Sequence, residues 1–336
     1  MSGGLLIFIL KIIGALVIAA IGIVVGLFYK GIDRKLAAMM QSRVGPPVRQ
    51  PFLDFFKLMI KENIVPENAV PWIFNGAPVM ALVSSITILF YIPFATLPAL
   101  LGDSGDLVLI AYLLTIPAIA MVVGGFSSGS TYASIGAQRE MVLMMSYELP
   151  LVTTIVALGW RLSLANPGLN VFSLEVLSAN PIWSLIGGPL GFIGAVLLLF
   201  TLAIVTPAEL SIVPFDIPEA ETELAGGILV EYSGRNLALF ELANAVKMII
   251  MAALTVVLFF PYNIAHLFSI SGFFAIVIDI IFFLVKLFVV IFFEATYIRV
   301  AVARLKINQA SVTYLIFLSA IGLMGLLFIA IDYLIG

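Results

Sequence analysis

The stretch VTYLIFLSAIGLMGLLFIAIDYL, residues 312–334, contains one charged side chain, Asp332, close to its end. A helix needs roughly 20 apolar residues to cross the hydrocarbon core of a bilayer, which is about 30 Å thick. This stretch is therefore long enough and apolar enough to span a membrane. The rest of the chain is similar in character, because hydrophobic residues make up 62% of its 336 residues and charged residues only 10%. This composition excludes a soluble globular protein.

Seven further apolar runs precede this stretch along the chain. The expected spans are Leu5–Tyr29, Ala77–Pro98, Leu107–Phe126, Gly136–Trp160, Ile186–Thr206, Leu237–Phe260, Gly272–Glu294 and Val312–Leu334. The sequence predicts an all-α, polytopic membrane protein with about eight transmembrane helices. Residues 1–336 are expected to form a single transmembrane bundle rather than a string of domains.

The basic residues predict which way the bundle faces. Eight crossings place both termini on one side of the membrane. The loops on the opposite side carry most of the lysines and arginines, whereas the N-terminal side shows only Arg161. Because cytoplasmic loops carry the excess of Lys and Arg, both termini are expected outside and the long loops in the cytoplasm.

The first long loop, residues 31–76, contains the segment QPFLDFFKLMIKE at positions 50–62. Its apolar residues recur at helical spacing, opposite its charged residues. They are Phe52, Phe55, Phe56, Met59 and Ile60, against Asp54, Lys57, Lys61 and Glu62. Because the segment is too short and too charged to span the bilayer, it is expected to form an amphipathic helix in the membrane interface.

The second long loop, residues 207–236, is acidic although it lies on the basic side of the protein. Its carboxylates include Asp216, Glu219, Glu221, Glu223 and Glu231, and they alternate with apolar residues that favour burial. Carboxylates held among apolar groups have raised pKa values and can exchange protons near neutral pH. The loop is interpreted either as part of a buried proton or ion path, or as an ordinary docking loop.

Ionisable residues also occur inside the expected spans, where they are costly and usually face a cavity or one another. Glu140 and Glu148 are two helical turns apart, and Glu241 and Lys247 share the sixth span. The seventh span carries Asp279, Lys286 and Glu294 at spacings that return to nearly the same helical face. Alternatively, Asp279 and Glu294 are end residues near the headgroups, and Lys286 extends to the interface. With water, these groups and the loop carboxylates could form a proton or ion relay.

Other kinds of site are excluded by composition. The chain has no cysteine and one histidine, His266, so it cannot by itself hold an iron–sulfur cluster, a haem pair or a structural zinc ion. Any redox chemistry must therefore occur in a partner. Nucleic-acid binding is also unsupported, because the net charge is −3 and the basic residues flank the spans.

Three ordered motifs resemble a known family. The first, Asp33-Arg-Lys35 with QSRVGPP at 41–47, QPFLD at 50–54 and Lys61-Glu62, looks like the first cytoplasmic loop of the membrane subunit of respiratory complex I that is called H or one. SYELP at 146–150 resembles the next motif of this family. PFDIPEAETEL at 214–224, with VEYSG at 230–234, resembles its most diagnostic one.

Two features resemble one branch of this superfamily more than the complex I branch. Complex I members carry several more residues between the Gly-Pro and Gln-Pro of the first loop, which here is the short GPPVRQP at 45–51. They also carry Gly-Glu-Ser-Glu where this chain has EAETE at 219–223, followed by LAGGI at 224–228. This pattern is similar to the membrane-bound group 4 nickel–iron hydrogenases and the archaeal membrane-bound sulfane sulfur reductases. The shortened loop speaks against quinone binding.

The resemblance implies a membrane-anchor and energy-coupling subunit without a redox centre, catalytic residue or bound cofactor of its own. Its implied partners are a small iron–sulfur subunit and a large catalytic subunit of a peripheral arm, antiporter-like membrane subunits, and the lipid bilayer. Iron–sulfur clusters, and in the hydrogenases a nickel–iron centre, would lie in those partners. The alternatives are the quinone-site membrane subunit of an NADH:quinone oxidoreductase and a purely structural membrane platform.

The resemblance also assigns roles to residues. Asp216, Glu219, Glu221, Glu223 and Glu231, with Glu140 and Glu148, resemble the family's chain of carboxylates between the redox site and the pumps. Glu241, Lys247, Asp279, Lys286 and Glu294 are added to this proton or ion relay because of their positions in the spans. Arg34, Arg43 and Asp54 match loop positions near the docking surface.

Overall fold

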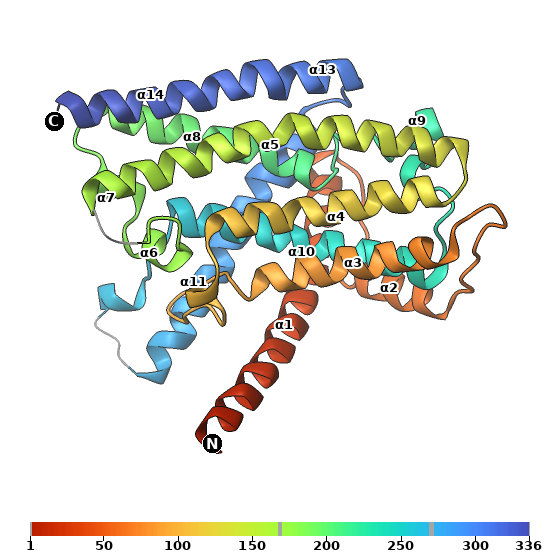
Figure 1. Ribbon diagram of the computed structural model, residues 1–336, viewed down its shortest axis with the longest axis horizontal. Helices are drawn as coiled ribbons and strands as arrows, with labels where there is room; N and C mark the ends of the chain where they lie inside the picture. The colour runs from red at the N-terminus through yellow and green to blue at the C-terminus, as the bar shows by residue number, and fades with distance from the viewer. Residues whose placement is uncertain (1, 167–169, 269–271, 336) are drawn as a thin grey trace.

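A computed structural model describes residues 2–166, 170–268 and 272–335 of the chain (Figure 1). Eight of its helical segments are long and apolar enough to cross a membrane. They are α1 (Ser2–Met40), α3 (Pro71–Leu89), α4 (Leu107–Ser127), α5 (Thr131–Ala165), α8 (Pro189–Glu209), α10 (Gly234–Phe259), α11 (Phe273–Ile291) with its continuation, and α13 (Ile307–Val312) with its continuation. The expected all-α polytopic membrane protein is thereby confirmed.

Short elements connect or extend these helices. The seventh span continues from α11 through the π-helical turn η4 (Phe292–Tyr297) into α12 (Ile298–Ala301), and the eighth runs from α13 through the π-helical turn η5 (Thr313–Leu318) into α14 (Ser319–Ile335). The remaining short helices are α2 (Gln50–Ile60), η1 (Gly102–Ser104), α6 (Leu174–Ala179), α7 (Ile182–Leu185), α9 (Glu221–Leu224), η2 (Gly227–Leu229) and η3 (Ala265–Phe268).

Helix α10 forms the centre of the bundle, and 94% of the residues in its most apolar stretch are buried. It packs against α1, α2, α3, α8 and α11, while α4 lies beside α3 and α5, and α14 lies beside α8 (Figure 1). The N-terminal half of α1 projects away from the other helices, and its side chains from Phe8 to Leu10 are exposed. Because α10 is buried among the other helices, the charged side chain of Lys247 can lie within a membrane span without facing lipid.

Several helices extend farther than the apolar runs predict, among them α1, α5 and α8, whereas α3 ends at Leu89, before the expected Pro98. The first span was expected to end at Tyr29, but α1 continues to Met40, so the loop of residues 31–76 begins inside a helix. Ala37 and Ala38 are fully buried there, which shows that packing maintains the helix after the apolar run ends. Likewise, α8 continues to Glu209, which lies on a helix and not in the acidic loop.

The expected amphipathic helix is present as α2, with Pro51 in its first turn, where the missing N–H of proline has no cost. Its apolar residues face two directions rather than one. Phe52 and Phe55 pack against the buried Leu27 and Leu242 of the neighbouring helices, whereas Phe56 is exposed.

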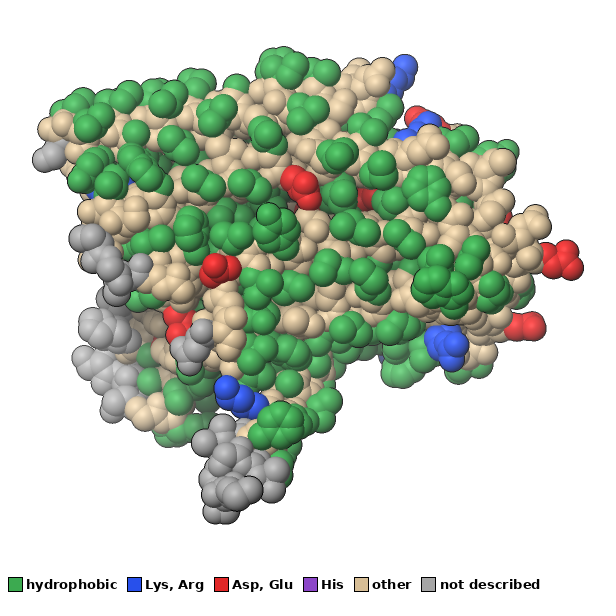
Figure 2. Space-filling model, in the orientation of Figure 1, with side chains coloured by type: hydrophobic (Ala, Val, Ile, Leu, Met, Phe, Trp, Pro, Cys, Tyr) green, Lys and Arg blue, Asp and Glu red, His purple; other side chains and the backbone are tan. Residues whose placement is uncertain are grey.

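Hydrophobic side chains cover the flank formed by α4, α5 and α14, and charged side chains gather at the end of the bundle that carries α2 and α9 (Figure 2). This end is called the charged end below. The basic residues in the C-terminal half of α1 and in α2 lie there, as does the acidic loop. The two long loops, distant in sequence, therefore form one surface.

Candidate functional site

The acidic loop is held against α5 by close backbone contacts. Gly136 of α5 leaves no room for a side chain, because a Cβ there would lie 2.5 Å from the backbone nitrogen of Ile228. Gly227 has a φ of +53°, and a Cβ there would overlap the carbonyl oxygen of Pro218. The Ile228 N–H donates to that same carbonyl at 3.1 Å. These contacts position Glu219, the residue after Pro218, against the bundle.

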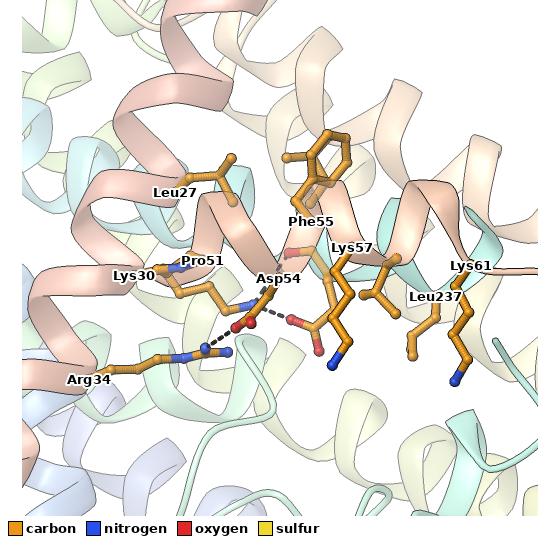
Figure 3. Close-up of a pocket in the computed structure, with 12 residues that line it drawn as sticks. Leu27, Lys30, Arg34, Pro51, Asp54, Phe55, Lys57, Lys61 and Leu237 are labelled. Atoms are coloured by element: carbon orange, nitrogen blue, oxygen red, sulfur yellow. Dashed lines mark hydrogen bonds and ion pairs between the residues drawn. The ribbon is translucent and has the colours of Figure 1, made fainter. Parts of the chain in front are cut away.

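Two cavities lie at the charged end. The outer cavity, of about 280 Å³, lies between α1, α2 and α10 (Figure 3). The inner cavity, of about 300 Å³, reaches the acidic loop, and its wall includes Glu219 and the Asp33–Arg299 pair. Both cavities are lined by Lys30, Arg34 and Glu241. Lys30 donates a hydrogen bond to the Glu241 carboxylate, so this ion pair stands where the two cavities meet.

Glu219 is the carboxylate of the acidic loop that lines the inner cavity. Its side chain is half-buried, and its Oε1 atom has no hydrogen-bond partner among the residues the structure describes. Burial, followed by the nearby carboxylates of Glu241 and Glu140, raises the pKa of Glu219 to about 8, although Lys30 opposes the shift. A carboxyl group with this pKa can gain or lose a proton near neutral pH.

We expect an infrared carboxyl band from Glu219 to titrate with a midpoint near pH 8. Because folding raises the pKa of Glu219 from 4.5 to about 8, the folded chain holds this proton more tightly than the unfolded chain. The contribution of Glu219 to stability is therefore fully present below the unfolded value and is lost as the pH rises to about 8. The band should be absent from Glu219→Gln. A band that titrates near the unfolded value would contradict this assignment.

A second ionic group lies deeper in the bundle. Lys247 of α10 pairs with Glu209 of α8 at 2.7 Å, and their side chains are only 5% and 2% exposed. Glu140 of α5 is 2% exposed, and its Oε2 atom has no hydrogen-bond partner within the described part of the chain. Both Lys247 and Glu209 act electrostatically on Glu140, and Glu209 also acts on the half-buried Glu148. Four ionisable side chains from three helices thus interact inside the protein.

The two ionic groups are linked through Glu140, because this carboxyl group interacts electrostatically with both Glu219 and the Lys247–Glu209 pair. The linked residues are called the carboxylate row below and comprise Glu241, Glu219, Glu140, Glu209 and Glu148, with the cations Lys30 and Lys247. The row runs from the inner cavity into the packed helices. Two buried tyrosines lie beside the row, because Glu209 acts electrostatically on both Tyr147 and Tyr314, whose rings are 6.4 Å apart.

The other carboxylates of the acidic loop are half-buried or exposed. Asp216 accepts hydrogen bonds from Arg304, whose Nη1 atom also donates to Thr222 at 2.7 Å. Glu223 is exposed and pairs with Arg139 at 2.5 Å. Arg139 therefore holds the loop to α5, and Arg304 holds it to the segment between α12 and α13. Glu221 is exposed and Glu231 is half-buried.

The three ionisable residues expected on one face of the seventh span lie in two separate environments. The buried Asp279 accepts N–H groups from Ile264 and Ala265 at 3.1 and 2.9 Å. Lys286 donates to the carbonyl oxygens of Phe260 and Tyr262 at 2.9 and 2.8 Å. Both side chains thus bind the backbone between α10 and α11, at the end of α10 opposite its acidic-loop end.

Glu294 lies apart from Asp279 and Lys286, in the π-helical turn η4. It is 4% exposed and accepts the Thr206 hydroxyl at 3.0 Å. The expected spacing assumed 100° per residue, which a π-helical turn does not follow. The structure shows no direct contact that joins Glu294 to the carboxylate row within the described residues.

The expected docking residues occupy different positions at the charged end. Arg34 and Asp54 form an ion pair at 2.9 Å between α1 and α2 (Figure 3). Gln50 also donates to Asp54 at 2.8 Å. Arg43 is exposed beyond the end of α1, and its Nε atom donates to Gln41 at 2.8 Å.

Several charged residues of the site, among them Glu209, Lys30 and Asp33, are absent from the expected relay and docking residues. From the sequence, Glu209 is expected in the acidic loop. Lys30 is used only to predict the orientation of the bundle in the membrane, and Asp33 only as part of a family motif. Asp33 is 3% exposed and accepts Arg299 at 2.7 Å and the Thr296 hydroxyl at 2.8 Å. The available signal was the position of Lys30 and Asp33 directly after an apolar run.

Comparisons with known proteins agree with this architecture. The sequence profile of the NADH dehydrogenase family matches residues 12–330. The chain is 34% identical over 284 residues to the H-type membrane subunit of the NADH-quinone oxidoreductase of Geobacillus kaustophilus, which covers 81% of this chain and 80% of that protein. It is 33% identical over 248 residues to an H-type subunit of the same enzyme from Rhizobium meliloti, which covers 68% of this chain and 71% of that one.

A solved structure is also similar over nearly the whole bundle. A chain of the membrane-bound sulfane sulfur reductase, an archaeal respiratory membrane complex, superposes with a TM-score of 0.81 at 26% identity, covering 95% of this chain and 99% of that one. The profile match and the H-type relatives each extend over more than two thirds of the sequence. The chain therefore belongs to the NADH dehydrogenase family of membrane subunits, together with the H-type subunits of the NADH-quinone oxidoreductases.

Proposed function

We propose that this chain is the membrane-anchor and energy-coupling subunit of a multi-subunit respiratory redox complex. The charged end faces the cytoplasm and binds a peripheral arm that contains a small iron–sulfur subunit and a large catalytic subunit. Antiporter-like membrane subunits bind the flank of the bundle and move the ions. The chain itself contributes charged side chains and no redox centre.

The carboxylate row carries this proposal. Its members extend from Glu219, at the inner cavity, to the buried Lys247–Glu209 pair inside the bundle. A redox change in the bound arm alters the charge or proton demand near Glu219. Because Glu219 has a pKa of about 8, such a change shifts its protonation near neutral pH. The altered charge of Glu219 acts on Glu140, and through Glu140 on the Lys247–Glu209 pair. The change in electrostatic potential thereby spreads laterally through the bundle.

The parent complex that we favour is a membrane-bound hydrogenase or a sulfane sulfur reductase. Two observations support this branch: the short first loop with its EAETE run, and the likeness to the sulfane sulfur reductase chain across the whole bundle. The second candidate is the quinone-site subunit of an NADH:quinone oxidoreductase, which the H-type relatives favour. Three activities of membranes that contain the complex would distinguish these candidates. Hydrogen evolution indicates a hydrogenase, polysulfide reduction a sulfane sulfur reductase, and quinone reduction an NADH:quinone oxidoreductase.

Glu219→Gln should reduce ion transport per electron by roughly tenfold or more, because glutamine cannot exchange a proton at the start of the row. Electron transfer should continue, since this chain holds no electron carrier. The measurement is ion uptake and electron transfer in the same membrane vesicles with the assembled complex. Glu67→Gln is the control, because Glu67 is an exposed carboxylate of the first long loop and belongs to neither the relay nor the docking residues.

A purely structural platform gives a different outcome. If the chain only held the arm against the bilayer, Glu219→Gln would either reduce assembly or leave transport per electron unchanged. The amount of assembled complex in the membrane, measured alongside transport, separates these cases. Full coupling in normally assembled Glu219→Gln complexes would end the relay proposal.

A further inference from the structure

Two further cavities lie toward the end of the bundle opposite the charged end, near α6 and α11 (Figure 1). The first, called the lysine cavity below, has a volume of about 220 Å³, and Lys286, Asn263 and Ser178 are the polar side chains of its lining. The second, called the apolar slot, has a volume of about 200 Å³ and lies between α1, α10 and α11. Both cavities lie outside the carboxylate row, so the proposed function leaves them without a role.

Lys286 gives the lysine cavity a cation with donor capacity to spare. Its Nζ atom donates to the carbonyl oxygens of Phe260 and Tyr262 at 2.9 and 2.8 Å. An ammonium group has three N–H donors, so one donor remains. Asp279 acts on Lys286 electrostatically, but the Asp279 carboxylate is itself bound to two backbone N–H groups. The remaining donor of Lys286 and the side-chain amide of Asn263 can therefore bind an anionic group.

The apolar slot lies beside two points at which α1 is held to the bundle. The Tyr29 hydroxyl donates to the carbonyl oxygen of Leu284 in α11 at 2.7 Å. Leu89 reaches α1 at Gly22, where an added Cβ would overlap its side chain. Every residue that lines the slot is apolar, and one of them, Ile21 of α1, is 57% exposed. The slot is therefore a hydrocarbon-lined space that opens toward the bilayer.

The two cavities adjoin each other. Ala95 and Phe283 line both of them. The Lys286 Nζ atom lies 5.7 Å from the centre of the Phe283 ring, so the cation stands beside a residue that borders both spaces. A ligand that occupies both cavities carries negative charge at one end and hydrocarbon at the other.

We propose that the lysine cavity binds the phosphate group of a membrane phospholipid and that the apolar slot binds one of its acyl chains. Lys286 and Asn263 donate hydrogen bonds to the phosphate, and the chain passes Phe283 and leaves the slot near Ile21. The two volumes fit a phosphate group and part of one chain rather than a whole lipid. The lipid belongs to the leaflet opposite the charged end, and its site does not depend on the parent complex.

The chemistry of the two linings favours a phospholipid over a soluble anion and over a neutral lipid. An apolar cavity does not hold ordered water, whereas an acyl chain from the bilayer fills it without loss of a hydrogen bond. A soluble phosphate compound leaves this slot empty. A neutral lipid leaves the half-buried ammonium group of Lys286 without an anionic partner, although such partners stabilise a buried cation.

The test uses a phosphatidylcholine that carries a photoactivatable diazirine group on one acyl chain. It is added in a limiting amount to the purified, assembled complex in detergent. After illumination, labelled peptides that contain residues 18–25 of α1 and residues 280–287 of α11 are quantified by mass spectrometry. Unlabelled phosphatidylcholine, a diacylglycerol with the same chains and inorganic phosphate are added as competitors in separate samples.

Three variants test the two parts of the site. Lys286→Gln and Asn263→Leu change the lysine cavity, and Val25→Phe fills the apolar slot. Lys11→Gln is the control for charge, because Lys11 is exposed on α1 and lines neither cavity. Val24→Phe is the matched control for the slot, because Val24 is the exposed neighbour of Val25 and does not line it.

We expect labelling of both peptides in the wild-type complex. Labelling should fall roughly fivefold in Lys286→Gln, as for the loss of one basic contact to a lipid, and roughly threefold in Asn263→Leu. Val25→Phe should reduce it by about tenfold or more, and both controls should leave it unchanged. Because Lys286→Gln also removes two hydrogen bonds to the backbone, the yield of assembled complex is measured with it, and Asn263→Leu decides if that yield falls.

The competitors and controls also state what would overturn the proposal. Unlabelled phosphatidylcholine should compete, whereas diacylglycerol should compete at least fivefold more weakly and millimolar inorganic phosphate should not compete. Equal competition by diacylglycerol would overturn the role of the phosphate, and competition by inorganic phosphate would assign the lysine cavity to a soluble anion. Unchanged labelling in Val25→Phe, or an equal loss in Val24→Phe, would show that the chain does not lie in the slot.

An unlabelled wild-type complex would likewise overturn the proposal, since the slot would then be closed to lipid.

Discussion

Lys247→Met should lower the stability of the bundle by about 3–5 kcal/mol and greatly reduce the amount of assembled complex. Lys247 and Glu209 are both almost completely buried and lie 2.7 Å apart. Removal of the lysine leaves the carboxylate of Glu209 without its cation, close to the buried carboxyl group of Glu140. Thermal unfolding of the purified complex in detergent, together with its yield from membranes, measures the loss.

Two control variants test whether the unpaired carboxylate of Glu209 causes this loss of stability. Lys247→Met combined with Glu209→Gln removes both charges and should restore most of the stability, since neutral replacement of a buried pair is far less costly than loss of one partner. Lys306→Met should change stability by less than about 0.5 kcal/mol, because Lys306 is exposed. A double variant as unstable as Lys247→Met alone would show that the size of the lysine side chain, rather than charge, is required.

Gly227→Ala should release the acidic loop from α5 at a cost of more than about 2 kcal/mol. The new methyl group would overlap the carbonyl oxygen of Pro218 and would sit on a residue with a φ of +53°. Because Glu219 follows Pro218 directly, its displacement should also reduce ion transport per electron. Limited proteolysis between residues 210 and 233 reports the released loop.

Two other glycines distinguish backbone strain from steric collision as the cause of loop release in Gly227→Ala. Gly226 has a φ of +107°, but a Cβ there would come no closer than 3.8 Å to another atom, so Gly226→Ala tests backbone strain without collision. Gly76 lies in α3 with no atom within 4 Å of its added Cβ, so Gly76→Ala should leave proteolysis unchanged. If all three variants were cleaved alike, the contact between Gly227 and Pro218 would not be what holds the loop.

The spans could be predicted from the sequence because the bilayer imposes a length and a composition on every crossing helix. The ends of the helices could not, because they depend on packing rather than on hydropathy. Helix α1 passes beyond Tyr29 to Met40 because buried residues such as Ala37 contact neighbouring elements. The π-helical turn at Phe292–Tyr297 had no signal in the spacing of apolar residues.

The types of residue in the site were predictable, but their partners were not. A carboxylate among apolar residues signals a costly buried group, and this signal identified Glu140 and Glu219. The sequence contains no comparable signal for pairs such as Lys247–Glu209 and Arg304–Asp216, which join residues far apart in the chain. For this reason the spacing of Asp279 and Lys286 suggested a continuous path, whereas both bind the backbone between α10 and α11.

The Lys30–Glu241 pair stands between two cavities of nearly equal size. Both side chains of this pair line both cavities, so neutralising either partner changes the electrostatic environment of both cavities at once. Because Glu241 and Lys30 also act on the Glu219 carboxyl group, whatever binds beside α2 is coupled to the protonation of Glu219 through this single pair.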